Sequence, residues 1–290
     1  MSNIRHQLLC VALNISCWEA RRQDKKVNGE VAAAHGTSTG VGRYHKDLLP
    51  DVVEHQSVLK LRNAWRVWHY ENTLPWGNDG SRVIRSAAFL DYAKEYREYK
   101  DKFEAACEAF YTVYHARVAE AEFKLNTLFD MADYPRLEIV KDRFSVRMTT
   151  YPMPNSEDFR IIEGIPPEEV KRLQSEAVAG LNEQVTLAIR DLWGRLHGVV
   201  SAMADRLEYT SEGRLPKFHD TLVSNISDLL DKVPQLNLTD DPEITTMTNA
   251  MRELIGYSPA TLREDLTARS EVSIKAKALA ARMACFVGER

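Results

Sequence analysis

A stretch of about fifty residues without proline or glycine constrains the fold of this chain more than any other feature. It runs from Ser81 to about Met131. Its apolar residues recur at alternating steps of three and four, a heptad pattern, at Phe89, Tyr92, Tyr96, Tyr99, Phe103, Ala106, Phe110 and Val113. After a one-residue shift the pattern resumes at Tyr114, Val118, Ala121, Leu125 and Leu128. A helix of this length extends about 75 Å, so it needs a partner helix to bury its apolar seam.

A second long helix is predicted from Pro166 to about Tyr209. It begins with two prolines and two glutamates, and such residues are favoured in the first turn of a helix. Its apolar stripe consists of Val170, Leu173, Ala177, Leu181, Val185, Ala188, Leu192, Leu196, Val199, Met203 and Leu207. Because the connector is short, we expect Phe89–Leu128 and Val170–Leu207 to pack as an antiparallel helical hairpin.

The connector, residues 132–165, carries a strand pattern of its own. Apolar and polar residues alternate from Phe144 to Thr149, and Asp158–Ile162 indicates a second strand after a proline-rich turn. The two strands predict a β-hairpin inserted between the long helices. Leu8–Cys17 is apolar on both alternating faces and predicts a buried strand. Whether that strand joins the hairpin in one sheet is left open.

Three shorter helices are expected after Gly213, at Phe218–Lys232, Asp241–Ile255 and Ser258–Phe286. The predicted fold class is therefore mostly α with a small β element: a long antiparallel helical hairpin, a β-hairpin insertion and a C-terminal helical bundle. The expected domains are a basic region of a strand and short helices at 1–80, the hairpin with its connector at 81–210, and the C-terminal helices at 211–290.

The composition favours a soluble protein of the cytoplasm. The four cysteines are widely spaced and form no C-x-x-C motif, which fits a reducing compartment. No stretch is long and apolar enough to span a membrane, and the N-terminus is a poor signal peptide. We expect no membrane association.

No catalytic, cofactor or metal motif stands out. His45, His55 and His69 lack the spacing of a metal pair, and Cys107 has no basic neighbour to activate it. A protein without enzymatic activity is expected, although catalytic groups from distant segments can converge in a fold.

Basic residues are concentrated near the N-terminus, where residues 1–70 hold ten lysines and arginines against six acidic residues. They are interleaved with Trp18, Tyr44, Trp65 and Trp68, a pattern that can track phosphates and stack bases. The candidate nucleic-acid contacts are Arg21, Arg22, Lys25, Lys26, Arg43, Lys46, Arg62 and Arg66. The isoelectric point near 6.1 argues against this function, and ordinary surface variation or packing in the core also explains the pattern.

The segment Gly36–Lys46 is rich in glycine and hydroxyl side chains and is predicted to be a loop. It is not a P-loop, because five residues separate Gly36 from Gly42 and Arg43-Tyr44 stands where Lys-Ser/Thr is required. Its backbone N–H groups can still face a phosphate, with Arg43 and Lys46 close by. The simpler interpretation is a flexible connector.

The leading functional hypothesis is protein interaction, because a helical rod with a β-tip offers strand edges and helix faces to a partner. The candidate partner contacts are Arg147, Tyr151 and Phe159, and a homo-oligomer is an alternative. DNA binding by the basic region is the alternative function.

The segment Trp68–Arg82, with its Thr-Leu-Pro-Trp core, resembles an uncharacterised phage and prophage family, domain of unknown function 3150. The resemblance extends to the N-terminal strand, the Gly-Arg-Tyr-His-Lys loop and the segments around Tyr151 and Asp158, more than half of the chain. Some members of this family are encoded beside a MoxR-type AAA+ ATPase and a von Willebrand-type partner, so the resemblance implies an accessory protein in the host cytoplasm, an adaptor or substrate of such an ATPase. The family transfers no functional residues.

Overall fold

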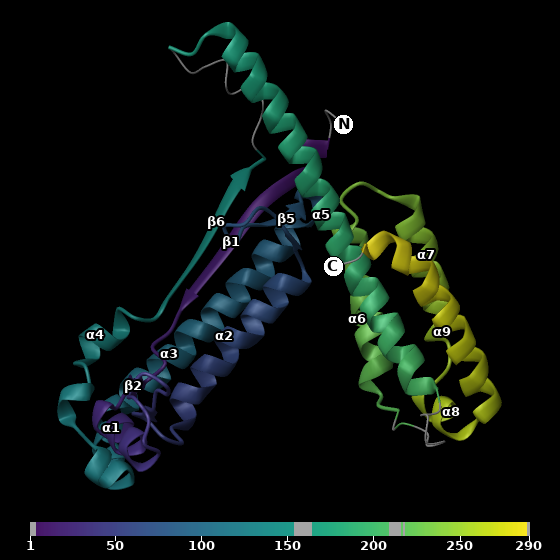
Figure 1. Ribbon diagram of the computed structural model, residues 1–290. Helices are drawn as coiled ribbons and strands as arrows, with labels where there is room; N and C mark the ends of the chain where they lie inside the picture. The colour runs from purple at the N-terminus through teal and green to yellow at the C-terminus, as the bar shows by residue number, and fades with distance from the viewer. Residues whose placement is uncertain (1–3, 154–163, 209–215, 217, 289–290) are drawn as a thin grey trace. The chain divides into compact units, whose positions relative to one another are not determined.

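A computed structural model describes residues 4–153, 164–208, 216 and 218–288. Helices dominate this part of the chain, as predicted, and the strands are few (Figure 1). The α-helices are α1 (Lys25–Ala34), α2 (Val53–Glu71), α3 (Phe89–Leu125), α4 (Leu137–Lys141), α5 (Pro167–Leu207), α6 (Thr221–Leu236), α7 (Pro242–Leu254), α8 (Pro259–Glu264) and α9 (Leu266–Val287). The strands are β1 (Leu8–Ser16), β2 (Arg21–Gln23), β3 (His45–Asp47), β4 (Leu74–Pro75), β5 (Arg82–Arg85) and β6 (Ser145–Pro152). Short 3-10 helices lie at Ile4–Gln7, Ser86–Ala88, Asn126–Leu128 and Met131–Asp133.

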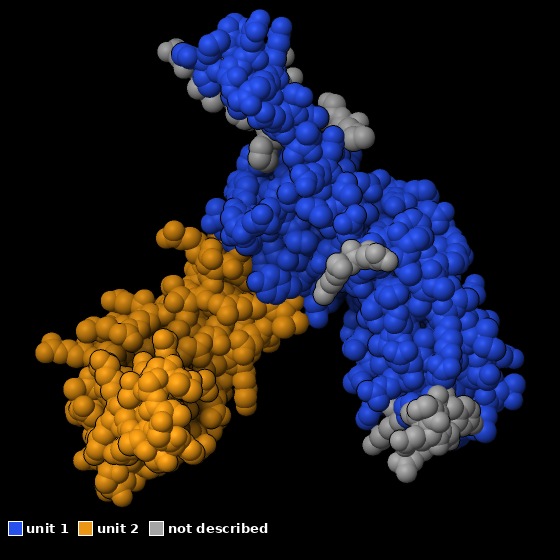
Figure 2. All heavy atoms as spheres, in the orientation of Figure 1, with its two compact units in different colours: residues 1–12, 69–92, 149–290 blue, residues 13–68, 93–148 orange. Residues whose placement is uncertain are grey.

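The chain divides into two compact units that alternate along the sequence (Figure 2). Unit 1 contains residues 1–12, 69–92 and 149–290, and unit 2 contains residues 13–68 and 93–148. Strands β1 and β6 and helices α2 and α3 each have residues in both units. Each unit is therefore built from segments that are distant in the sequence.

A sheet with the strand order β4-β5-β1-β6 confirms the predicted N-terminal strand and the first strand of the connector. β1 pairs antiparallel with β5, with Leu8 opposite Arg85 and Val11 opposite Arg82. The question left open by the sequence is answered, because β6 lies beside β1 in this sheet. The second predicted strand, Asp158–Ile162, lies outside the described residues.

In unit 2, the apolar seam of α3 packs against α2 (Figure 1). The Trp65 ring stacks on Tyr99 at a centroid distance of 5.7 Å and also contacts Phe103. Farther along, His55 of α2 contacts Phe110. Because earlier residues of α2 meet later residues of α3, the two helices run antiparallel.

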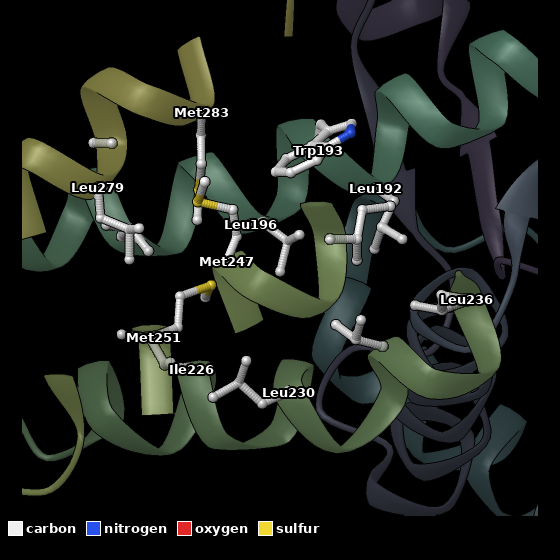
Figure 3. Close-up of a cluster of buried hydrophobic side chains, with 14 of the residues drawn as sticks. Leu192, Trp193, Leu196, Ile226, Leu230, Leu236, Met247, Met251, Leu279 and Met283 are labelled. Carbon is white, nitrogen blue, oxygen red and sulfur yellow. The ribbon is translucent and has the colours of Figure 1, made fainter. Parts of the chain in front are cut away.

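In unit 1, α5 packs antiparallel to α9. Trp193 stacks on Phe286 with a centroid distance of 4.3 Å, while Arg269 near the start of α9 donates to the Leu207 carbonyl at the end of α5. Helices α6 and α7 complete the bundle. Figure 3 shows its core, where side chains of these four helices converge, among them Leu196, Ile226, Met247, Met251 and Met283.

The predicted pairing of the two long helices with each other is therefore corrected. Both helices form, but α3 packs on α2, and α5 packs on α9 and α6. The heptad pattern defines which face of α3 is buried, and it does not define the partner. α2 supplies a tryptophan-lined face that fits the aromatic seam equally well.

Helix boundaries differ from the prediction at two places. Ser81 does not begin a helix, because residues 82–85 form β5 and α3 begins only at Phe89. The last predicted helix is divided into α8 and α9 at Asp265, whose carboxylate accepts hydrogen bonds from the N–H groups of Thr267 and Ala268. A side chain that caps a new helix end competes with continuation of the old helix.

Candidate functional site

The loop after α1 is held against this helix at both ends. Asp24 caps the start of α1, and its backbone N–H donates to the Tyr44 carbonyl at 3.0 Å. The Tyr44 N–H donates in turn to the Asn28 side chain. At the other end the Thr37 N–H donates to the Ala32 carbonyl at 2.9 Å. The predicted loop is thus anchored to α1, with a free middle section.

Between α1 and this loop lies a groove of about 710 Å³, within the size range of small-molecule sites. We call it the α1 groove. Its lining residues are Asn28, Val31, Ala32, His35, Thr37, Ser38, Thr39, Val41, Gly42, Arg43 and Tyr44. They include one arginine and no carboxylate, together with hydroxyl groups and apolar side chains. This lining favours an anionic ligand with an apolar part.

Arg43 lies in the α1 groove, but Lys46 does not. The Lys46 side chain is only 6% exposed, and its ammonium lies 2.7 Å from Asp133 Oδ2 and 3.6 Å from Asp24 Oδ2. It also donates to the Leu128 carbonyl at 2.6 Å. Burial lowers the pKa of Lys46, but the hydrogen bond and charge of Asp133 outweigh burial and leave the pKa above its ordinary value. Lys46 is a buried structural cation, which corrects its assignment as a contact to phosphate.

The remaining predicted nucleic-acid contacts fall into two groups. Arg62 forms an ion pair with Glu19, and Arg66 donates to the Ile15 carbonyl at 2.8 Å. Both contacts lie within unit 2, although Arg66 is exposed. The second group consists of the exposed residues Arg21, Arg22, Lys25, Lys26 and Arg43 on β2, the first turn of α1 and the loop. In this group, Arg22 lies 2.7 Å from Asp133 Oδ1.

The aromatic residues of the basic region mostly belong to the core. Trp18, Trp65 and Trp68 are buried, at 7%, 0% and 9% exposure, whereas Tyr44 is 40% exposed. A buried indole cannot stack on a base, so the predicted platform is reduced to Tyr44. The helical spacing of Trp65 and Trp68 was a signal for the core.

The candidate partner contacts are on or after β6. Arg147 is exposed, whereas Tyr151 is half-buried and its hydroxyl lies 2.5 Å from Ser81 Oγ. Phe159 lies outside the described residues. β6 is the end strand of its sheet, and no described strand pairs with its outer edge. Its side chains are exposed or half-buried from Ser145 to Pro152. Arg147 is therefore an exposed side chain on the end strand of the described sheet, and its role as a partner contact stays a prediction.

Arg82 is a buried arginine that was not predicted as a functional residue, and it holds the first residue of the Thr-Leu-Pro-Trp segment in place. Arg82 donates to the Thr73 Oγ1 at 2.6 Å and to the carbonyl groups of Thr73 and Tyr70. Arg195 of α5 donates to the carbonyls of Thr73 and Glu71. Two guanidinium groups therefore satisfy carbonyls at the C-terminal end of α2, where positive charge is favoured. Burial, followed by the charge of Arg195, lowers the pKa of Arg82 to about 10.

Possible metal ligands and cysteine thiols are the remaining reactive groups to place among the described residues. No group of three or more His, Cys, Asp or Glu side chains within them is arranged to hold a metal ion. Burial raises the pKa of Cys17 to about 11 and of Cys107 to about 12, which keeps both thiols protonated at neutral pH. In the described residues no helix combines the length and apolar character needed to cross a bilayer.

Comparison with known proteins finds no family model, no curated protein and no solved structure that matches this chain.

Proposed function

We propose that this protein is a non-enzymatic adaptor or scaffold that binds an extended segment of a partner protein along the outer edge of β6. The observation that carries the proposal is the position of this eight-residue strand at the end of the sheet, where no strand of the described residues pairs with its outer edge. An edge strand offers unpaired backbone N–H and C=O groups, and a partner strand can pair with them by β-augmentation.

The side chains of β6 support this use. Residues 145, 147, 149 and 150 are exposed polar residues, and Arg147 is the charged member of the strand. Natural proteins protect a free edge with charges, prolines or short strands. β6 has one arginine and a terminal proline, Pro152, and four exposed polar side chains. We expect a partner segment with a carboxylate opposite Arg147.

The family resemblance indicates which partner to test first. We propose an AAA+ ATPase, with the protein acting as a phage-encoded accessory factor in the host cytoplasm. A second copy of this chain is the alternative occupant of the same edge, in which case the protein is a homo-oligomer.

Site-specific photo-crosslinking tests the proposal. A photoreactive amino acid replaces Arg147 on β6 and, as the matched control, Arg282 on the exposed face of α9. In extract of the source cell we expect a discrete protein adduct from position 147 only, and mass spectrometry of the adduct identifies the partner. No adduct at position 147, or the same adducts from both positions, would contradict the proposal.

A pair of proline variants shows whether backbone pairing is involved. In a strand, adjacent N–H groups point to opposite edges, so Thr149→Pro and Thr150→Pro remove one N–H that faces β1 and one that faces outward. We expect one variant to lose thermal stability, and the other to keep its melting temperature and lose the adduct. If the stable variant retains the adduct, the partner does not bind by strand addition.

Nucleic-acid binding is the second candidate function, and the exposed cations favour it. Arg21, Lys25, Lys26 and Arg43 are exposed, and within the described part of the chain none of them forms an ion pair. A gel shift at low salt compares the wild type with a variant in which all four are glutamine. Binding that the variant loses supports this function, and no shift of the wild type at low salt excludes it, because phosphate contacts are strongest there.

A further inference from the structure

We propose that the α1 groove binds a small phosphate-bearing molecule with a planar ring, of the nucleotide class. This site lies within unit 2 and is independent of the β6 edge, so either proposal can fail without the other. The inference rests on three features of the groove: the charge of its lining, the apolar side chains and tyrosine ring in that lining, and the glycines of the loop.

Charge favours a phosphate. Arg43 is the cation that lines the groove, and the lining contains no acidic residue. The hydroxyl groups of Thr37, Ser38 and Thr39 line it as well and can donate to phosphate oxygens. A guanidinium with its fixed fork of donors is well suited to a phosphate group.

Other residues of the lining suit a planar ring. Val31 and Val41 are 50% and 74% exposed, and the half-exposed ring of Tyr44 also belongs to the lining. Exposed apolar side chains next to an aromatic ring provide a surface on which a base can stack. The helix places Val31, Ala32 and His35 on one face of α1, because they are three and four residues apart.

The glycines of the loop also support a ligand in the α1 groove. Gly36 has φ of +60°, as expected of the residue that follows a helix end. This backbone conformation explains why position 36 is a glycine. Gly40 and Gly42 do not have positive φ, and a Cβ atom at either position would meet no atom within 4 Å. Neither packing nor backbone conformation requires glycine there. Glycine is also favoured where a ligand approaches the backbone closely, and in the described structure the N–H groups of Gly40 and Gly42 donate to no backbone carbonyl.

Calorimetric titration of the full-length protein tests the assignment with four probes: AMP, ATP, adenosine and inorganic phosphate. We expect saturable binding of at least one nucleotide, tighter than that of adenosine or phosphate alone. Loss of one charge-assisted contact weakens binding by about tenfold or more, so we expect Arg43→Gln to have this effect. Gly42→Val fills the groove and should weaken binding to a similar degree.

Matched controls separate binding from folding. Arg21→Gln removes an exposed cation outside the groove, and Gly29→Ala adds a methyl group to α1 where no atom lies within 4 Å. Both should bind as the wild type does, and all four variants should melt within a few degrees of it. The proposal is overturned if no nucleotide binds, if Arg43→Gln and Gly42→Val bind normally, or if adenosine binds as tightly as AMP. Binding of a short oligonucleotide without binding of any mononucleotide would instead assign the groove to nucleic acid.

Discussion

The buried imidazole of His69 should make the protein sensitive to mild acid. His69 is 3% exposed, and its Nδ1 lies 2.7 Å from the Tyr92 hydroxyl. Burial, with a smaller contribution from the charge of Arg82, lowers the pKa of His69 from 6.5 to about 4. Between these two values the unfolded chain binds a proton that the folded protein excludes. Stability is therefore complete above pH 6.5 and is lost as the pH falls toward 4.

The size of the effect follows from the two pKa values. At pH 5 the linkage relation gives a loss of about 2 kcal/mol relative to pH 7.5. The pKa of His55 is also lowered, first by burial, so His55 adds a loss in the same direction. The free energy of unfolding of folded domains is typically about 5–15 kcal/mol. A loss of about 2 kcal/mol is therefore a large fraction of the total stability.

Urea unfolding at pH 7.5 and pH 5 measures this loss for the wild type and for His69→Asn, which keeps a hydrogen-bonding group near Tyr92. The comparison uses the difference between the two pH values within each protein, so a constant loss of packing cancels. We expect this difference to shrink by about 2 kcal/mol in the variant. An unchanged difference would refute the reasoning that His69 is neutral in the folded protein.

Substitutions at three further positions test separate features of the fold. Lys46→Met removes the cation that Asp133 contacts and should cost about 3 kcal/mol in urea unfolding, because it leaves a buried carboxylate without this partner; a neutral result would show that the pair is solvated. Trp65→Phe should cost only about 1 kcal/mol against about 3–5 for Trp65→Ala, because the buried Trp65 Nε1 has no hydrogen-bond partner within the described structure. Equal losses from the two variants would show that this N–H is bonded in solution. Asp265→Ala removes the cap of α9 and should lower stability by about 1 kcal/mol, and an unchanged midpoint would argue against the cap.

Local features were predictable from the sequence because short-range chemistry determines them. The proline pair opens α5 within a residue of the expected place. The strand alternation after Phe144 gives β6, and α6 and α7 form within a few residues of the predicted ranges. In each case the signal and the structure lie within the same few residues.

Long-range choices were not predictable from the same patterns. A heptad seam specifies a buried face, and several apolar stripes of this chain can cover it, so the partner of α3 was assigned wrongly. Sequence patterns define consecutive segments, whereas the two units alternate along the chain.

The candidate site shows the same difference between local features, which were predictable, and long-range contacts, which were not. Arg43 lines the α1 groove, and its contact with a phosphate stays a prediction. The buried position of Lys46 depends on Asp133, which is 87 positions later in the chain. Net charge over a window counts each cation equally and does not show which ones meet a carboxylate in the fold. The role of Arg82 had no sequence signal, because its partners are backbone carbonyls.

Residue-resolved amide hydrogen exchange along Ser145–Tyr151 tests the central claim most directly, since it needs no partner. With β1 on one side and no described strand on the other, N–H groups of alternate residues should be protected and the ones between them should exchange rapidly. Protection of every residue would mean that the outer edge is already occupied, and rapid exchange of all of them would mean that β6 does not form the end of the sheet.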